Sequence, residues 1–464
     1  MKIGIVKRMV FLLVLVALGV QVTAQNQDST AAPQQKQEKK ILTLDECMRI
    51  AMQNNIELKR SKNNAQIASA NYFQSMMEYL PNVSGNINYD WYNGTFFDNT
   101  AARQVTEVTN SSNPNLSANM VLFNGFNNHF YRKSTENRRE AAINAINEQK
   151  IGVESNVLAS YLQVVLDKEN IKISENLIAL LEAQLEREKK RHEVGVGNLE
   201  LVYNFQSQLA NENLNLVTAK NRLMTDMLTL LQVLQLEVSA NYDVAPYELA
   251  PGEHLADKEQ FAEVLESSLS YSPGIKRAVA ASEASRYDYK SAQAGYMPTI
   301  TAFGRIGSSF SSNGARNPET GNYDAGASFD DQMNWNKFDY LNLSMNIPIF
   351  NNWRTKNSSQ VAKLNMENAA LDLEQTELNV TNTIQQVYVD LISAQATHKA
   401  AEENLIALNQ SFEFAETRYE NGNTDFFTYL ESLNNKNRAE IELVNAKYQI
   451  VFRKKILDVY RGLL

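Results

Sequence analysis

The sequence lacks the residues and motifs on which most enzyme, metal and disulfide chemistry depends. Cys47 is its only cysteine, so one chain cannot form an internal disulfide. It contains no glycine-rich phosphate loop, no nucleophile elbow and no zinc-binding helix motif. The four histidines are scattered without the spacing of a metal-ligand pair, at His129, His192, His254 and His398. The sequence therefore predicts a protein that is not an enzyme and that uses neither a metal nor a cofactor.

A basic excess and a long apolar run are also lacking. With 44 Lys and Arg against 53 Asp and Glu, the formal net charge is −9, which does not favour binding to nucleic acid. A membrane-spanning helix needs about 20 apolar residues, and no run beyond the amino terminus approaches that length. An exported chain of this kind either lies free beyond the inner membrane or crosses an outer membrane as β-strands.

The amino terminus predicts export. A basic start, an apolar segment over residues 9–20 and small residues ending at Ala24 are the three parts of a secretory signal peptide, residues 1–24. A membrane anchor is the alternative, but the apolar segment has only about 12 residues against the roughly 20 that a span needs. Residues 25–40 are rich in Gln, Lys and Ala and have little to bury, so they predict a flexible lead-in.

Proline and glycine are scarce, at 9 and 18 residues, and one long segment is almost free of both. Residues 126–193 contain no proline and one glycine, and their apolar residues recur at helical spacing. Such a helix is roughly 100 Å long. The two glycines of residues 194–198 can stop it, because glycine accepts positive φ. A second helix is predicted by apolar residues seven apart, the pattern of a coiled-coil seam, at Val202, Leu209, Leu216, Leu223 and Leu230.

Two segments before this hairpin change to a period of two. Over residues 82–92, and again over residues 116–123, apolar or aromatic side chains alternate with Ser, Asn and Asp. Transmembrane β-strands have about 9–11 residues with apolar side chains outward and polar side chains inward. A soluble sheet with one polar face is the alternative. A single helix over residues 41–78, capped by Thr43, is predicted before the first strand, and a polar loop over residues 93–115 between the two.

The whole arrangement occurs twice. Pro81, which ends the first helix, recurs as Pro298 after 217 positions, and Phe123 recurs as Phe350 after 227 positions. Because the larger offset holds throughout the hairpins, their long helices are predicted to be equal in length. The first unit covers residues 41–236 and an irregular segment residues 237–257. The second unit covers residues 258–464, with a helix over 259–295, strands over 299–310 and 339–349, a loop between them and a second hairpin.

Four strands are too few to close a membrane barrel, of which the smallest has about eight. An open sheet edge is not viable in lipid, because its backbone groups would remain unsatisfied. The sequence therefore predicts that several copies of the chain assemble and pool their strands.

With this layout, the sequence resembles the TolC family of outer-membrane efflux proteins over essentially the whole mature chain. The resemblance rests on the duplicated order of helix, strand pair and long hairpin, and on the two glycine-containing breakers. It implies a mainly α-helical fold with a membrane β-barrel: a homotrimer with a 12-stranded barrel in the outer-membrane lipid and a trimeric α-helical tunnel that extends into the periplasm. It implies a passive exit duct for small molecules or proteins, which a periplasmic adaptor protein and an inner-membrane transporter deliver.

The resemblance also assigns roles at the hairpin tips, which would dock onto the adaptor and close the tunnel. The tip candidates are Val194, Gly195, Val196, Gly197, Arg418, Tyr419, Asn421, Gly422, Asn423 and Thr424. The family's two pore-narrowing carboxylates fall on Thr428 and Glu431; Thr428 departs from the pattern, and Asp425 is a candidate substitute. The family's basic gate residue falls on Thr424, a second departure, so the family's interhelix latch does not carry over. A ring of Glu431 carboxylates would bind cations, and a solvated helix face is the alternative.

Two other functions are compatible with export. One is a periplasmic coiled-coil structural or adaptor protein without a membrane barrel, and the other is a secreted enzyme on a helical stalk. The length and the outward apolar alternation of the strands favour the membrane channel, and no catalytic constellation supports the enzyme.

Overall fold

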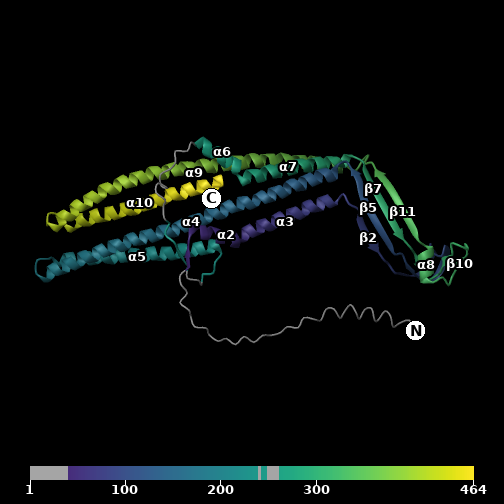
Figure 1. The fold of residues 1–464 in the computed structure, drawn as a ribbon, viewed down its shortest axis with the longest axis horizontal. Helices are drawn as coiled ribbons and strands as arrows, with labels where there is room; N and C mark the ends of the chain where they lie inside the picture. Colours follow the sequence, from purple (N-terminus) through teal and green to yellow (C-terminus); the bar gives the residue numbers. More distant parts are fainter. Residues whose placement is uncertain (1–39, 239–241, 248–260, 464) are drawn as a thin grey trace, which may run out of the picture.

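The computed structural model describes residues 40–238, 242–247 and 261–463. The molecule is elongated: long helices run side by side, and a β-sheet extends from one end of them (Figure 1). The predicted signal peptide, the lead-in and most of the predicted irregular segment lie outside the described residues. None of the helices that the structure describes is long and apolar enough to cross a membrane.

Two helical hairpins of equal dimensions form the body of the molecule (Figure 1). In the first, α4 (Asn127–Glu193) has 67 residues and α5 (Leu199–Leu234) has 36. In the second, α9 (Arg354–Glu420) and α10 (Phe426–Arg461) have the same 67 and 36 residues. The predicted equality of the long helices is confirmed. A packed hairpin fixes its length because one inserted residue would rotate all later side chains by about 100° away from the seam.

Two shorter helices precede each hairpin, where the sequence predicted one. They are α2 (Leu44–Asn54) and α3 (Ile56–Met77) in the first unit, and α6 (Phe261–Tyr271) and α7 (Pro273–Gln293) in the second. The prediction of one continuous helix over residues 41–78 and another over residues 259–295 was therefore wrong.

The breaks between these helices occupy equivalent positions, because Asn55 and Ser272 are 217 positions apart. Each of them caps the following helix: the side chain of Asn55 accepts the N–H of Leu58, and that of Ser272 accepts the N–H of Ile275. Such caps satisfy backbone donors that a helix start leaves open. The predicted cap Thr43 is present on α2, with its hydroxyl oxygen 3.2 Å from the nitrogen of Glu46.

A four-stranded antiparallel sheet, in the order β11-β7-β5-β2, joins the two units. Its strands are β2 (Asn82–Asn86), β5 (Asn115–Asn124), β7 (Thr299–Gly307) and β11 (Phe338–Asn346). The register sorts side chains by polarity, since neighbours across the strands point to the same face. One row across the sheet holds Val83, Ala118, Gly304 and Leu341. The next row, on the opposite face, holds Ser84, Ser117, Arg305 and Tyr340.

A small folded cap covers the far end of the sheet, where the sequence predicted only loops. The hairpin of β3 (Asp90–Asp98) and β4 (Arg103–Ser112) pairs with β8 (Phe310–Ser311). The two-residue strands β9 (Ala315–Arg316) and β10 (Tyr323–Asp324) and the short helix α8 (Phe329–Trp335) complete it. The polar-loop prediction for residues 93–115 was therefore wrong. The single strand predicted over residues 82–92 was wrong as well, because β2 ends at Asn86 and β3 begins at Asp90 in a different sheet. The cap has a polar interior, in which buried Asp98 accepts hydrogen bonds from Ser311 and Asn313 and from the N–H of Thr100 and of Ala101.

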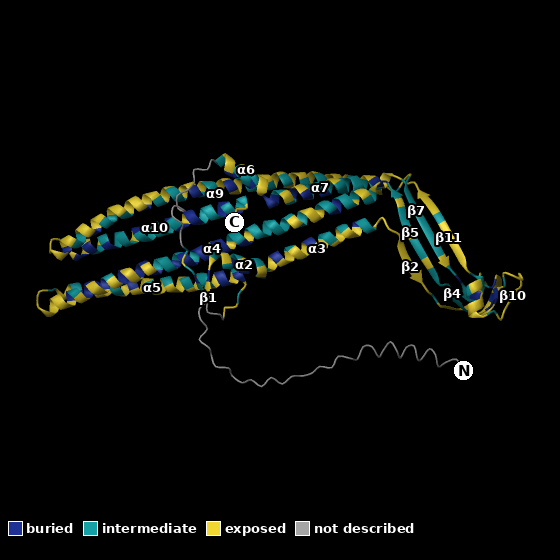
Figure 2. Ribbon diagram, viewed as in Figure 1, coloured by how far each residue is buried: buried dark blue, intermediate teal, exposed yellow. Residues whose placement is uncertain are grey.

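Two hydrophobic clusters hold the hairpins together, and most buried residues lie along these helices (Figure 2). The larger cluster surrounds Tyr161 at mid-length and includes residues of α2, α4, α5, α9 and α10. Beside it, β1 (Lys40–Leu42) pairs in parallel with β6 (Tyr242–Val244), the described part of the irregular segment. The smaller cluster lies near the hairpin tips and joins residues of both hairpins.

Candidate functional site

Both hairpin tips lie at the end of the molecule opposite the sheet and form equivalent turns (Figure 1). Gly195 has φ 77° and Gly422 has φ 71°, a conformation that glycine adopts without strain. The N–H of the next residue then bonds back to the helix, from Val196 to the carbonyl of Arg191 at 3.0 Å and from Asn423 to that of Arg418 at 2.8 Å. These bonds satisfy carbonyl groups at the helix ends.

The two turns differ two residues after the glycine of positive φ. Gly197 packs so closely on its own turn that an added Cβ would lie 2.6 Å from the backbone nitrogen of His192. Its counterpart is Thr424, which carries a side chain at that place. The guanidinium of Arg418 folds onto the second turn and donates to the carbonyl of Asn423 at 3.1 Å. Arg418 therefore supports the shape of its own tip.

The three candidate pore residues lie on one exposed face at the start of α10. Asp425, Thr428 and Glu431 are three positions apart and all exposed, which is the spacing of one helical face. Asp425 also caps the helix, since its carboxylate accepts the N–H of Thr428 at 3.0 Å and the hydroxyl of Thr428 at 2.8 Å. These hydrogen bonds lower the pKa of Asp425, so it stays charged at neutral pH.

The opposite face of α10 is buried against aromatic residues of both hairpins. Phe205 of α5 lies 4.7 Å from Phe426 and 6.3 Å from Tyr429, measured between ring centroids. Tyr419 of α9 stacks on Tyr429 at 4.8 Å. This aromatic cluster fixes which way α10 is turned. It thereby holds the Asp425 face away from the core.

Polar contacts next to this cluster also join the two hairpins. Arg187 of α4 forms an ion pair with Glu420 of α9, with Nη1 2.6 Å from Oε1. One helical position on, fully buried Glu188 accepts a hydrogen bond from Arg191 at 3.1 Å. Burial and the nearby Glu188 raise the pKa of Tyr419 to about 12. The predicted tip residue Tyr419 therefore lies neutral inside the contact between the hairpins.

Several apolar side chains are exposed at the tips. Val194 and Val196 on the first turn are 73% and 70% exposed, and Phe427 at the start of α10 is 69% exposed. Exposed apolar patches with a polar surround are typical of protein-binding surfaces. They give the tips a surface that a partner protein can cover.

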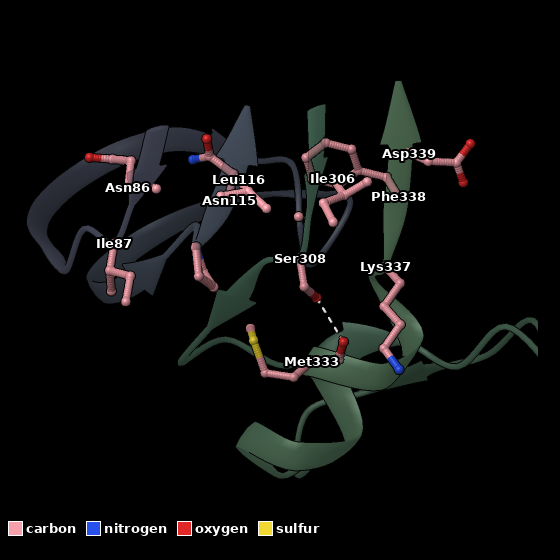
Figure 3. A pocket seen from close by; sticks show the side chains of 13 residues that line it. Asn86, Ile87, Asn115, Leu116, Ile306, Ser308, Met333, Lys337, Phe338 and Asp339 are labelled. Carbon is pink, nitrogen blue, oxygen red and sulfur yellow. Dashed lines mark hydrogen bonds between the residues drawn. The ribbon is translucent and has the colours of Figure 1, made fainter. Parts of the chain in front are cut away.

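A pocket of about 770 Å³ lies at the other end, between the sheet and the cap (Figure 3). Its wall is mainly apolar, with Ile306 and Phe338 from the sheet and Met333 from α8. The hydroxyl of Ser308 donates to the carbonyl of Met333 at 2.9 Å and ties the cap to the sheet. Only Lys337 and Asp339 among the lining residues carry charge, and Figure 3 shows their charged groups pointing away from each other. The pocket offers no pair of groups for acid–base chemistry.

The model of a protein family described as "Outer membrane efflux protein" matches residues 48–234 and 264–458, most of each repeated unit. The chain belongs to this family. It is 23% identical to outer membrane protein TolC of Escherichia coli (strain K12) over 275 residues, which cover 58% of this chain and 53% of TolC. It is 21% identical to outer membrane efflux protein BepC of Brucella suis biovar 1 (strain 1330) over 411 residues, 86% of this chain and 81% of BepC. The chain thus spans about half the length of TolC and most of BepC.

Solved structures share the fold of this outer membrane efflux protein. The crystal structure of the outer membrane protein VceC from Vibrio cholerae has a TM-score of 0.75 at 14% sequence identity. The match covers 90% of this chain and 96% of VceC.

The two turns of this efflux protein could be predicted from its sequence, but the contacts between the hairpins next to the turns could not. The interhelix pair Arg187 and Glu420, the buried Glu188 and the ring of Phe205 were not among the candidates. The one available signal was Phe205 itself, a large aromatic residue three positions after the seam residue Val202 and so on the same helical face. Its partners lie more than 200 positions away, and no local pattern identifies them.

Proposed function

We propose that the protein is the outer-membrane channel of a tripartite export system. In this proposal three copies form one 12-stranded barrel and one helical tunnel, a passive exit duct for small molecules or proteins. A periplasmic adaptor protein and an inner-membrane transporter deliver the cargo.

The observation that carries the proposal is the sheet with one apolar face and two unpaired edges. Within the described residues, β2 pairs only with β5 and β11 only with β7, so the outer edge of each has no strand beside it. Leu341 and Leu343 on β11 are 83% and 70% exposed, with their side chains on the apolar face. Such a face suits lipid, and lipid does not tolerate open edges. Pairing β11 of one copy with β2 of the next would satisfy both requirements.

Exposed apolar stripes on the helices support assembly independently. On α5, Tyr203, Val217 and Met224 are exposed, each one position after a residue or heptad place of the seam, at multiples of seven residues. On α9, five exposed residues have the same spacing, Leu364, Leu371, Leu378, Ile392 and Ile406. These stripes have the period of a coiled-coil seam, and no helix among the described residues covers them. A neighbouring copy would cover them.

The tips would form the gate and the docking site of this duct. Asp425, Thr428 and Glu431 would face the pore, because the aromatic cluster occupies the opposite side of α10. The Arg187–Glu420 ion pair would hold the two hairpins together when the gate is closed. The exposed Val194, Val196 and Phe427 would contact the adaptor.

Purification from outer membranes, followed by planar-bilayer recording, tests the proposal. We expect a trimer that dissociates only on heating and that conducts ions through a single defined pore. A periplasmic coiled-coil protein would instead remain in the soluble fraction and make no pore. A soluble protein without a pore would refute the channel. We do not expect this result, because the sheet has an apolar face.

A further inference from the structure

A pair of carboxylates lies inside the first hairpin, away from the tips. Arg222 Nε lies 3.4 Å from one carboxylate and 3.6 Å from the other, which places Asp226 of α5 beside Asp167 of α4, a residue that is only 3% exposed. Its Oδ1 atom contacts Gln163 Nε2 at 3.2 Å and Arg222 Nε at 3.4 Å. Its Oδ2 atom is buried and has no donor among the described residues. A buried carboxylate oxygen without a donor is costly, and facing a second carboxylate makes it more so.

One proton would remove this conflict. A carboxyl O–H on either residue can donate to the other carboxylate, and only one negative charge then remains for Arg222 to balance. Arg222 lies 3.6 Å from Asp226 and is 63% exposed, so water weakens its contribution.

The other charged groups nearby are already engaged. Lys168 of α4 pairs with Asp243 of β6, and Lys220 of α5 pairs with Glu175 of α4 at 2.9 Å. On the side of α10, burial and then the charge of Glu169 raise the pKa of Tyr448, so this side chain is neutral.

The second hairpin shows a different solution at the equivalent place. The positions 227 residues after Gln163, Asp167 and Asp226 hold Asp390, Ala394 and Arg453. There α9 and α10 are joined by an ordinary ion pair, with Arg453 Nη1 3.1 Å from Asp390 Oδ2. An Asp–Arg pair joins opposite charges and needs no shared proton, whereas two facing carboxylates repel each other unless one of them binds a proton. The second hairpin therefore serves as an internal reference for the first, because it lacks the carboxylate pair.

We propose that Asp167 and Asp226 form a proton-binding site that clamps the first hairpin, holding α5 on α4 when the proton is bound and loosening the contact when it leaves. Burial, followed by the hydrogen bond to Asp226 and its charge, raises the pKa of Asp167 to about 7. An opened, hydrated Asp would titrate near its ordinary value of about 4. The closed contact therefore binds the extra proton between these values, and its stability falls as pH rises from about 4 through about 7 and is constant above that.

The direct test is hydrogen–deuterium exchange of the full-length protein in lipid nanodiscs at pH 6 and pH 8.5, corrected for intrinsic exchange. Peptides around residues 215–232 of α5 report on the clamp, and the equivalent residues 442–459 of α10 serve as the internal reference. We expect opening of α5 relative to α10 to become about tenfold more frequent at the higher pH. Asp167→Asn should abolish the rise, because its amide donates to Asp226 at every pH.

The matched control is Asp390→Asn in the second hairpin. It should loosen α10 at both pH values and leave the pH response of α5 in place. Equal protection of α5 and α10 at both pH values in the wild type, or a pH response that survives in Asp167→Asn, would overturn the proposal.

Infrared difference spectra between pH 6 and pH 8.5 give an answer that does not depend on the folding of Asp167→Asn. The wild type should show the C=O band of a buried protonated carboxyl that disappears toward pH 8.5, and Asp226→Asn should alter it. Absence of this band would also overturn the proposal. Neither measurement requires pore activity, so the outcome is independent of the proposed channel function.

Discussion

Arg187 of the first hairpin and Glu420 of the second are 2.6 Å apart, although 233 positions separate them in the chain. Their side chains are 38% and 47% exposed, so water screens the pair and its contribution to global stability is small, about 0–1 kcal/mol. Its significance is positional, because it joins the two hairpins close to their tips.

Removing this pair should open the tips without unfolding the protein. We expect Arg187→Ala to raise single-channel conductance in planar bilayers and to leave the unfolding temperature within a few degrees of the wild type. Lys190→Ala is the matched control, because Lys190 pairs with Glu186 of its own helix at 3.3 Å. Conductance that rises equally in both variants would show that charge near the tip matters and that the contact between hairpins does not.

Because apolar and polar rows alternate across the sheet, a lysine substitution should have opposite outcomes at two neighbouring residues. Leu343 lies in a row with Ala302 on the apolar face, and Ser344 lies beside Thr301 on the polar face. A lysine on a lipid-facing position near the middle of a membrane strand costs about 2–4 kcal/mol. We therefore expect Leu343→Lys to deplete heat-modifiable trimer in outer-membrane fractions, and Ser344→Lys to be tolerated. Equal tolerance of both lysines would contradict a lipid-facing assignment.

The cap at Asn55 should stabilise the first turn of α3. Asn55→Ala should destabilise the start of α3 by about 1 kcal/mol, because its Oδ1, 2.9 Å from the nitrogen of Leu58, satisfies an N–H that would otherwise lack a partner. Hydrogen exchange of the first turn of α3 measures the effect. Asn55→Asp should preserve protection, and exposed Asn63→Ala in the same helix should not reduce it. An unchanged first turn in Asn55→Ala would mean that packing alone fixes the break.

The long helices could be predicted from the sequence because their signals are local and repeated. The seam from Val202 to Leu230 gives the helical period, and the glycines Gly195 and Gly422 mark the turns. The constant offset of 227 fixed the relative lengths. The rows of the sheet follow from a period of two in each strand, which needs no knowledge of the partner strand.

The breaks at Asn55 and Ser272 were missed although each had a signal. Ser272 is followed by Pro273, and Ser before Pro is typical of a helix start. Apolar residues continue at helical spacing across both positions, and the prediction of one continuous helix followed that pattern and not the capping residues. The folded cap over the sheet had weaker signals, because it is organised around a polar residue, Asp98, and segments rich in Asn, Ser and Thr are typical of loops.

Contacts between the hairpins could not be predicted, since no local pattern states which residues of one hairpin meet the other. The same limit applies to Asp167 and Asp226. Each of them looks like an ordinary charged residue on a helix until the two helices are packed together.

If this face of α10 lines the pore, substitutions at Glu431 should change how the pore binds cations. Glu431 is the acidic candidate to test, because the other one, Asp425, also caps the helix. Glu431 is exposed on the same helical face as Asp425 and Thr428. Three such carboxylates around an axis would attract cations strongly, because each raises the negative potential at the other two. We expect Glu431→Ala to weaken the block of single-channel current by divalent cations, and Thr428→Glu to strengthen it by adding a second ring. Glu442→Ala, on the exposed surface of α10 farther from the tip, is the control and should leave the block unchanged. Block that does not respond to Glu431→Ala would mean that Glu431 belongs to a solvated outer face, and that the aromatic cluster turns α10 the other way in the assembled tunnel.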